Sequence, residues 1–257
     1  MMSWSNLSGV GKAELRATRV ELHWLSQAAA LYALAVLPKE EDWTHYALRW
    51  DGSLQRMVTA DGVVAINLTL GTIELDSEEL DPRGMTLPEV LEWLSAAVGI
   101  EGLNQADLPH EMPAHPLGEG GAFALTDGRA MSELCGWYGA AAEIIDNHGE
   151  VHIWTHHFDI ATVTYRGEEG RQVLAGLSPG DADYSEPYFY VTPWPHPDEG
   201  DLRGLPSGHW HTKGWIGAIL TGSELDVHRD KKAAAALFVA EAIRVSTELV
   251  STKGSVS

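Results

Sequence analysis

Residues 151–166 read VHIWTHHFDIATVTYR, a run of mostly β-branched and aromatic residues without glycine or proline. These residue types favour extended backbone, so we expect one long strand over this range. Alternate residues of a strand lie on the same face of a sheet. The strand therefore places His157 and Asp159 on one face and His152 and His156 on the other.

Helices are predicted on both sides of this strand. Thr126 or Asp127 can cap a helix that runs to about Asp146, and an alanine-rich helix is expected from Asp230 to Val250. Prolines and glycines divide the chain between the long strand and the last helix. We expect loops at 167–183 and 193–207, and strands at 187–192 and 208–221.

The N-terminal half follows a similar order of elements. A helix is predicted from Lys12 to Leu37, where Pro38 ends it, and a second helix opens at Thr86-Leu87-Pro88-Glu89 with Thr86 as its N-cap. Asp51-Gly52 and Asp61-Gly62 are typical of tight turns. Hairpin-length links favour antiparallel pairing. We expect strands at 43–50, 55–59 and 63–75.

Short strings recur in the same order in both halves, which indicates a duplicated unit. We predict an α+β fold in which a single globular domain, residues 1–257, contains two tandem helix–β–β–β–helix units. The units span about 12–99 and 126–252 and are joined by a Pro/Gly-rich linker at 100–125, with mainly antiparallel sheet and helices on one face. The alternative is two unrelated α+β halves. The matched strings are Glu21-Leu22 with Glu133-Leu134, Trp43-Thr44-His45 with Trp154-Thr155-His156, and Gly71-x-Ile73 with Gly217-x-Ile219.

Three motifs give the chain a family resemblance. They are Leu22-His23-Trp24, Phe158-Asp159-Ile160-Ala161, and Glu186-Pro187-Tyr188-Phe189-Tyr190 leading into Pro193-Trp194-Pro195. The chain resembles a bacterial family known only as a domain of unknown function, whose members have a Leu-His-x-Trp helix, a Phe-Asp-Leu-Ala strand and an aromatic strand ending in Tyr-Pro-Glu-Pro. This sequence lacks the usual glutamate of the last motif and has His196 after Pro195. The resemblance implies no established activity or site.

The composition excludes several classes of partner. Lys and Arg number 17 against 37 Asp and Glu, a formal net charge of -20, which opposes binding to nucleic acid or to anionic membrane surfaces. The single cysteine, Cys135, leaves no internal disulfide framework. The longest apolar run, Ala28 to Leu37, is shorter than the roughly 20 residues that span a bilayer. We expect a soluble cytoplasmic protein, and the sequence does not determine its oligomeric state.

Histidines are concentrated in the second half. His209 and His211 share a face of the last predicted strand, and imidazoles converge with Asp159 if that strand pairs with residues 151–166. Neutral imidazole and carboxylate are ligands for Zn, Fe, Mn or Ni. The sequence therefore predicts a candidate site for a divalent transition metal and small-molecule chemistry, with Glu186 or Tyr190 as candidate catalytic acid/base groups. The candidate ligands are His157, Asp159, His209 and His211.

Other interpretations need no metal. The histidines are ordinary strand residues in one, acid/base groups in another, and part of a metal-free small-molecule pocket with aromatic walls in a third. In a fourth, the acidic surface is a protein-interaction module for a basic partner. The positions that match the candidate ligands in the first half are apolar, so we expect the functional residues in the second half. The candidate pocket residues are His156, Tyr188, Trp194 and Trp210.

One histidine string in the linker resembles a zinc-binding motif. His110-Glu111-x-x-x-His115 spaces its histidines five residues apart, and Pro113 breaks the helix that would align such ligands. We therefore expect no metal site in this segment.

Overall fold

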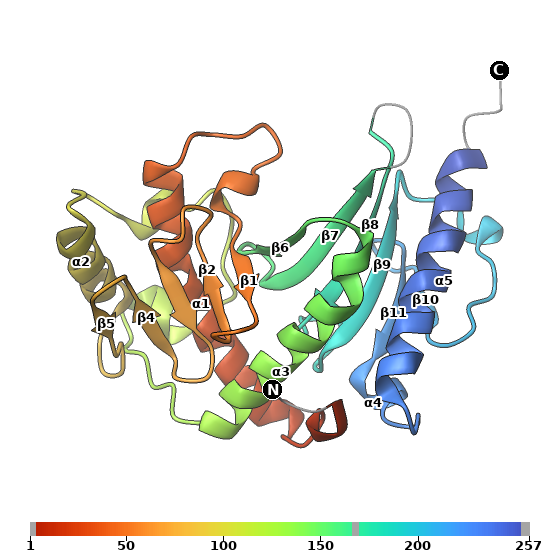
Figure 1. The fold of residues 1–257 in the computed structure, drawn as a ribbon, viewed down its shortest axis with the longest axis horizontal. Coiled ribbons are helices and arrows are strands. Elements are labelled where there is room, and N and C mark those ends of the chain that lie inside the picture. Colours follow the sequence, from red (N-terminus) through yellow and green to blue (C-terminus); the bar gives the residue numbers. More distant parts are fainter. Residues whose placement is uncertain (1–3, 166–169, 253–257) are drawn as a thin grey trace. The chain divides into compact units, whose positions relative to one another are not determined.

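The computed structural model describes residues 4–165 and 170–252, and it shows an α+β fold with two antiparallel sheets (Figure 1). The chain forms two compact units. The N-terminal unit consists of residues 10–135 and 152–158, and the C-terminal unit consists of residues 1–9, 136–151 and 159–257. The five-stranded sheet lies in the N-terminal unit, and the six-stranded sheet lies in the C-terminal unit except for residues 152–154 of its end strand.

The N-terminal unit is built on helix α1, Lys12–Val36, which packs against helix α2, Leu87–Val98, and against the sheet (Figure 1). Its five strands pair in chain order, each antiparallel to the next. The strands are β1 (Arg49–Asp51), β2 (Arg56–Val58), β3 (Ala65–Asn67), β4 (Thr72–Glu74) and β5 (Glu79–Leu80), and the 3-10 helices are η2 (Thr44–Tyr46), η3 (Gln105–Asp107) and η4 (Pro116–Glu119).

Helix α1 is the centre of this unit because nearly every side chain from Leu22 to Ala33 is buried. Leu22, Leu25 and the alanines supply apolar surface, so the helix is covered on all sides rather than along one stripe. Gln27 is also fully buried and needs hydrogen-bond partners. The predicted helix from Lys12 to Leu37 is confirmed to within one residue at its C-terminal end.

The predicted start of helix α2, with Thr86 as its N-cap, is confirmed. Thr86 accepts a hydrogen bond from the Glu89 backbone, and the Glu89 side chain accepts from the Thr86 backbone, which completes a capping box. Pro88 stands in the first turn, where its missing N–H has no partner to lose. Gly99 ends the helix in the left-handed conformation with φ 71°.

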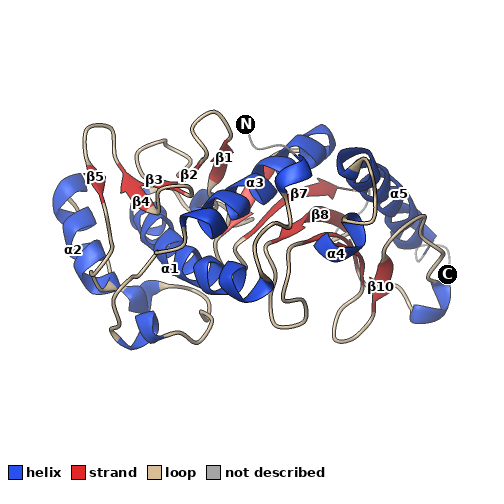
Figure 2. Ribbon diagram, turned by 90° about the horizontal axis from the view of Figure 1, so that it is seen from below, coloured by secondary structure: helices blue, strands red, loops and turns tan. Residues whose placement is uncertain are grey.

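The C-terminal unit contains most of a six-stranded antiparallel sheet in the order β10-β11-β9-β8-β7-β6, of which β6 belongs to the N-terminal unit from residue 152 on. Helix α5, Lys231–Thr252, packs on β8, β9 and β11 with Phe238, Val239 and Ala242 buried (Figure 2). Helix α3, Gly128–Ile145, begins in the N-terminal unit and ends in this one, capped by the Asp127 carboxylate. The other elements are η1 (Trp4–Asn6), η5 (Asp146–His148), β6 (Val151–Trp154), β7 (Asp159–Tyr165), β8 (Gln172–Ser178), β9 (Tyr188–Trp194), η6 (Glu199–Asp201), β10 (His209–His211), β11 (Gly217–Thr221) and α4 (Gly222–Leu225).

The structure corrects the predicted strands. The segment 151–166 is not one strand, because a turn at 155–158 divides it into β6 and β7. The Phe158 backbone N–H bonds to the Trp154 carbonyl at 2.7 Å, and Phe158 has φ 55°. The predicted loop at 167–183 contains β8, which pairs with β7 and β9. The predicted strand at 63–75 is the hairpin of β3 and β4.

The boundaries of the two compact units also differ from those of the predicted repeats. Residues 126–135 and 152–158, which the repeat assigns to the second half, belong to the N-terminal unit. The tandem duplication stays a prediction. In the ranges that the structure describes, no helix is both long and apolar enough to cross a membrane.

Candidate functional site

The predicted metal site requires strand pairing that does not occur. Asp159 begins β7, whereas His209 and His211 lie on β10 at the far edge of the same sheet. Three strands separate β7 from β10, so at about 4.8 Å per strand spacing they lie about 19 Å apart. His157 is not on a strand but in the turn before β7, and its side chain is exposed. Among the described residues, no group of three or more His, Cys, Asp or Glu side chains is placed to hold a metal ion.

His209 and His211 do meet around one tyrosine. The Tyr184 Oη atom lies 3.2 Å from His209 Nε2 and 3.0 Å from His211 Nδ1. His209 Nδ1 lies 3.0 Å from Glu224 Oε1, and His211 Nε2 lies 2.8 Å from the Lys213 carbonyl. We call Tyr184, His209, His211 and Glu224 the His–Tyr–His cluster. Tyr184 was missed in the sequence because it lies in a loop, 25 residues from His209.

Tyr190 and Asp159, the other polar pair in this sheet, form a buried hydrogen bond that passes over β8. Tyr190 on β9 donates to Asp159 on β7, and the strand between them has Gly176 opposite Tyr190. A Cβ atom on Gly176 would lie 2.9 Å from Tyr190 Oη. Because glycine has no side chain, the Tyr190 phenol has room to cross β8. Burial, followed by the charge of Asp159, raises the pKa of Tyr190 well above its usual value. Tyr190 is therefore a neutral donor inside the sheet.

The remaining predicted residues of this unit do not line one pocket. Tyr188 and Trp194 lie at opposite ends of β9, and the Tyr188 hydroxyl donates to Asp181 at 2.6 Å. Trp194 is 48% exposed. Trp210 donates its indole N–H to the Arg203 carbonyl at 2.7 Å. The Glu186 carboxylate accepts from the Ser223 backbone N–H and hydroxyl at the start of α4, so these contacts give it a structural use.

His156 belongs instead to a cluster of imidazoles in the N-terminal unit. The ring centroids of His156 and His110 lie 6.0 Å apart, and His156 also contacts His157 at 4.3 Å. The Thr155 carbonyl accepts from His23 Nε2 at 2.8 Å and from Gln27 Nε2 at 2.9 Å. The other end of the Gln27 amide, Oε1, lies 3.1 Å from His110 Nε2. One buried glutamine on α1 therefore links the turn at 155–158 with the segment that carries His110.

The lowered pKa values of His23, His110 and His156 keep these three imidazoles neutral. Burial lowers the pKa of His23 to about 3, against the opposing effect of its hydrogen bond to Thr155. Burial, with His157 and His110 nearby, lowers the pKa of His156 to about 4. Burial also lowers the pKa of His110. A neutral imidazole has one N–H donor and one lone-pair acceptor, so a hydrogen bond of known polarity identifies its tautomer.

Hydrogen-bond polarity assigns the tautomer of His110. Gln27 donates with its amide nitrogen, so its Oε1 atom is the acceptor that faces His110 Nε2. His110 is then the Nε2–H tautomer, and its Nδ1 atom is a buried acceptor without a hydrogen bond. Such an atom costs about 1–3 kcal/mol unless a further group meets it. Within the described ranges, three neighbouring polar atoms are also buried without a hydrogen bond: the donor Trp154 Nε1, Thr155 Oγ1 and His156 Nδ1.

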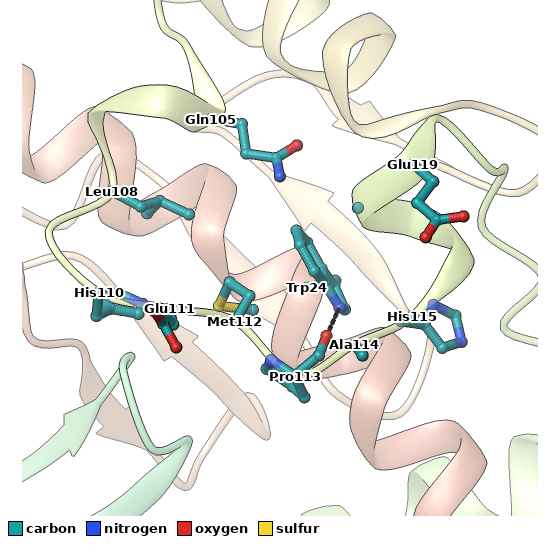
Figure 3. Close-up of a pocket in the computed structure, with 11 residues that line it drawn as sticks. Trp24, Gln105, Leu108, His110, Glu111, Met112, Pro113, Ala114, His115 and Glu119 are labelled. Carbon is teal, nitrogen blue, oxygen red and sulfur yellow. Dashed lines mark hydrogen bonds between the residues drawn. The ribbon is translucent and has the colours of Figure 1, made fainter.

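A cavity of about 400 Å³ opens beside His110 in this unit. Figure 3 shows the indole of Trp24 in its middle, with His110 and Glu111 on one side and His115 and Glu119 on the other. The Trp24 indole is fixed by a hydrogen bond to the Pro113 carbonyl at 3.2 Å. We call this cavity the Trp24 pocket, and its lining residues are Trp24, Gln105, Leu108, His110, Glu111, Met112, Pro113, Ala114, His115, Gly118 and Glu119.

The charge of the Trp24 pocket is negative. Glu111 and Glu119 line it, and no Lys or Arg does. Across residues 4–165 and 170–252, neither carboxylate forms an ion pair within 4.0 Å. The pocket lies largely in residues 100–125, where the sequence predicts a linker, and not in the second half, where we expect the functional residues. A signal is present in the string His110-Glu111-x-x-x-His115, although these residues line a pocket rather than forming a helix.

No protein-family model, no curated protein and no solved structure matches this chain. The resemblance to a bacterial family therefore stays a prediction. The function of the chain has to be inferred from the geometry of its own residues.

Proposed function

We propose that this protein binds a small organic cation, such as an amine attached to an apolar or aromatic group, in the Trp24 pocket. The observation that carries this proposal is the combination of Trp24 with two carboxylates that have no cationic partner among the described residues. Trp24 is only 3% exposed and gives the pocket an aromatic floor, whereas Glu111 and Glu119 are exposed and attract a cation by charge. A concave pocket with several convergent polar groups is typical of small-molecule sites.

The hydrogen-bond chemistry of the pocket agrees with a donor-rich ligand. The exposed carboxylates of Glu111 and Glu119 are the acceptors that line the pocket. His115 Nδ1 accepts from the Leu117 backbone N–H at 3.3 Å, so the ring has only its Nε2–H left to donate. An ammonium group carries three N–H donors and no acceptor, which complements this set. The apolar part of the ligand would contact Leu108, Met112 and Pro113.

The charge of the whole chain supports the same kind of ligand. A net charge of -20 raises the local concentration of cations and lowers that of anions near the surface. Binding of a free small molecule is also compatible with a cytoplasmic location, and neither nucleic acid nor membrane is part of the proposal.

Calorimetric titration tests the proposal with three probes of similar shape. They are 2-phenylethylamine, which is cationic, 2-phenylethanol, which is neutral, and 3-phenylpropionate, which is anionic. We expect the amine to bind most tightly and the carboxylate to bind least. A partly exposed charge pair contributes up to about 1 kcal/mol, so Glu111→Gln and Glu119→Gln should each weaken amine binding by up to about fivefold.

Glu92→Gln is the matched control, because Glu92 is an exposed glutamate of the same unit outside the pocket. It should leave amine binding unchanged. Equal affinity for all three probes would contradict the choice of a cation. No heat of binding with any of them would contradict the pocket as a site for ligands of this kind.

A further inference from the structure

The His–Tyr–His cluster in the C-terminal unit has two ends whose hydrogen-bond polarity is fixed. The Lys213 backbone carbonyl only accepts, so His211 Nε2 carries a proton and donates across 2.8 Å. The Glu224 carboxylate only accepts, so His209 Nδ1 carries a proton and donates across 3.0 Å. In their neutral forms both rings would then present a lone pair to Tyr184, from His209 Nε2 and from His211 Nδ1.

When both rings are neutral, one of the two contacts to Tyr184 Oη lacks a proton. The Tyr184 hydroxyl has one proton and can donate it to only one of the two imidazole nitrogens, which lie 3.2 and 3.0 Å from its oxygen. The other contact would bring a nitrogen lone pair against an oxygen lone pair. One added proton removes the conflict, because the protonated ring donates to Tyr184 while Tyr184 donates to the other ring.

We propose that the His–Tyr–His cluster is an acid–base site that holds one exchangeable proton shared between His209 and His211 through Tyr184. The proton changes ring by a concerted shift. One imidazolium gives its proton to Tyr184 Oη, and Tyr184 gives its own proton to the opposite ring.

The surrounding structure fixes each member of the cluster. The second oxygen of Glu224 accepts from the Thr221 backbone N–H at 2.8 Å and from its hydroxyl at 2.9 Å, in the capping box of α4. Asp181 accepts from the Tyr184 backbone N–H at 2.8 Å and so shapes the loop that presents the phenol. His211 is 9% exposed and stacks on Trp215 at 4.6 Å. The His209 side chain is 44% exposed, so the shared proton extends from a buried ring to one open to solvent.

The charges that face Tyr184 keep it a hydroxyl. Burial raises its pKa, and Asp181, Asp183 and Glu224 add to that rise because each opposes a tyrosinate. A tyrosine that stays protonated can both donate and accept, as the relay requires. The carboxylate of Glu224 balances the charge of the one imidazolium beside it.

Nitrogen-15 NMR of histidine-labelled protein tests the proposal without a ligand. Long-range proton–nitrogen spectra report which ring nitrogen is protonated, and His209→Gln and His211→Gln spectra assign the two rings. We expect His209 to be the Nδ1–H tautomer and His211 the Nε2–H tautomer when neutral. We also expect each ring to report the protonation of the other during a pH titration, because they compete for one proton.

Tyr184→Phe removes the bridging hydroxyl and should make the two rings titrate independently. Tyr32→Phe is the matched control, because it also removes a hydrogen-bonded phenol, the partner of Asp61 in the N-terminal unit, and should leave the coupling intact. Amide spectra of each variant establish that it is folded. Opposite tautomers in the wild type, independent titration of the two rings, or unchanged coupling in Tyr184→Phe would each overturn the proposal.

Discussion

Gly176 leaves the space in which Tyr190 and Asp159 form their hydrogen bond across β8. An added Cβ at this position would lie 2.5 Å from the Ile160 carbonyl oxygen and 2.9 Å from Tyr190 Oη. The first neighbour is backbone and cannot move aside as a flexible side chain would. The contact between Tyr190 and Asp159 therefore depends on a residue without a side chain.

We predict that Gly176→Ala destabilises the protein by about 1–3 kcal/mol or more, through overpacking and the weakened bond between Tyr190 and Asp159. Urea denaturation measures the change in the free energy of unfolding. Gly200→Ala is the control, because nothing lies within 4 Å of the place that its Cβ would take and its φ is not left-handed. Equal stability of both variants would show that β8 adjusts without cost.

Buried His23 is a single residue that makes the stability of the protein depend on pH. Its folded pKa of about 3 lies below the ordinary histidine value of 6.5, so the unfolded chain binds a proton that the folded chain does not. Above pH 6.5 the ring is neutral in both states, so the free energy of unfolding is highest there. It decreases as the pH falls from 6.5 toward 3, because protons bind to the unfolded chain. Each pH unit in that window corresponds to about 1.4 kcal/mol for such a group.

His23→Gln keeps a donor for the Thr155 carbonyl but removes the titration. We predict that the free energy of unfolding falls by about 2 kcal/mol less in this variant than in the wild type between pH 6.5 and 5. Denaturation curves at the two pH values measure the difference. A wild-type slope in His23→Gln would mean that His23 is not the group responsible.

Capping chemistry explains, at the scale of elements, why both ends of α2 were predictable. The signal is local, since Thr86 and Glu89 stand three residues apart and Gly99 follows the last turn. We predict that Thr86→Ala lowers stability by about 1 kcal/mol, the usual cost of losing an N-cap hydroxyl. Thr86→Ser, which retains the hydroxyl, should lose much less. Equal losses in a denaturation series would contradict a capping role.

The strands were less predictable because their limits depend on distant partners. Residues 151–166 carry uniform β propensity, and nothing local marks the turn that places Phe158 at φ 55°. In β8 the residues are buried on both faces, so the sequence QVLAGLS lacks the alternation that marks a half-buried strand. Pairing across the sheet, rather than propensity, fixes both elements.

The candidate site also combines local relations, which the sequence shows, with distant contacts, which it does not. His209 and His211 were selected correctly as neighbours on one face, because that relation is local. Their partner Tyr184 and the separation of β10 from β7 are set by strand order, which the sequence does not display. The role of His110 was missed because its partner Gln27 lies 83 residues away.

At the scale of the whole molecule, the chain passes between its two compact units more than once. Residues 126–135 and 152–158 complete the N-terminal unit. Ile153 exchanges two backbone hydrogen bonds with Leu48, of 2.7 and 2.9 Å, and Thr155 supplies the carbonyl for His23 and Gln27. A cut between the predicted repeats would remove these contacts from the N-terminal unit.

We therefore predict that residues 1–125 expressed alone do not unfold cooperatively, because they leave the buried polar groups of His23 and Gln27 without their shared acceptor. Circular dichroism during urea denaturation provides the measurement, with the full chain as control. A cooperative transition in the fragment would favour a self-sufficient first repeat instead.

Binding of a small organic cation beside Trp24 can be followed through the NMR signal of the Trp24 indole N–H. In tryptophan-labelled protein this signal is assigned by its absence in Trp24→Phe. During titration with 2-phenylethylamine it should shift and saturate, while 3-phenylpropionate should leave it unchanged and Glu111→Gln should require more amine for the same shift. An indole signal that does not respond to the amine, or that responds equally to the carboxylate, would contradict such binding.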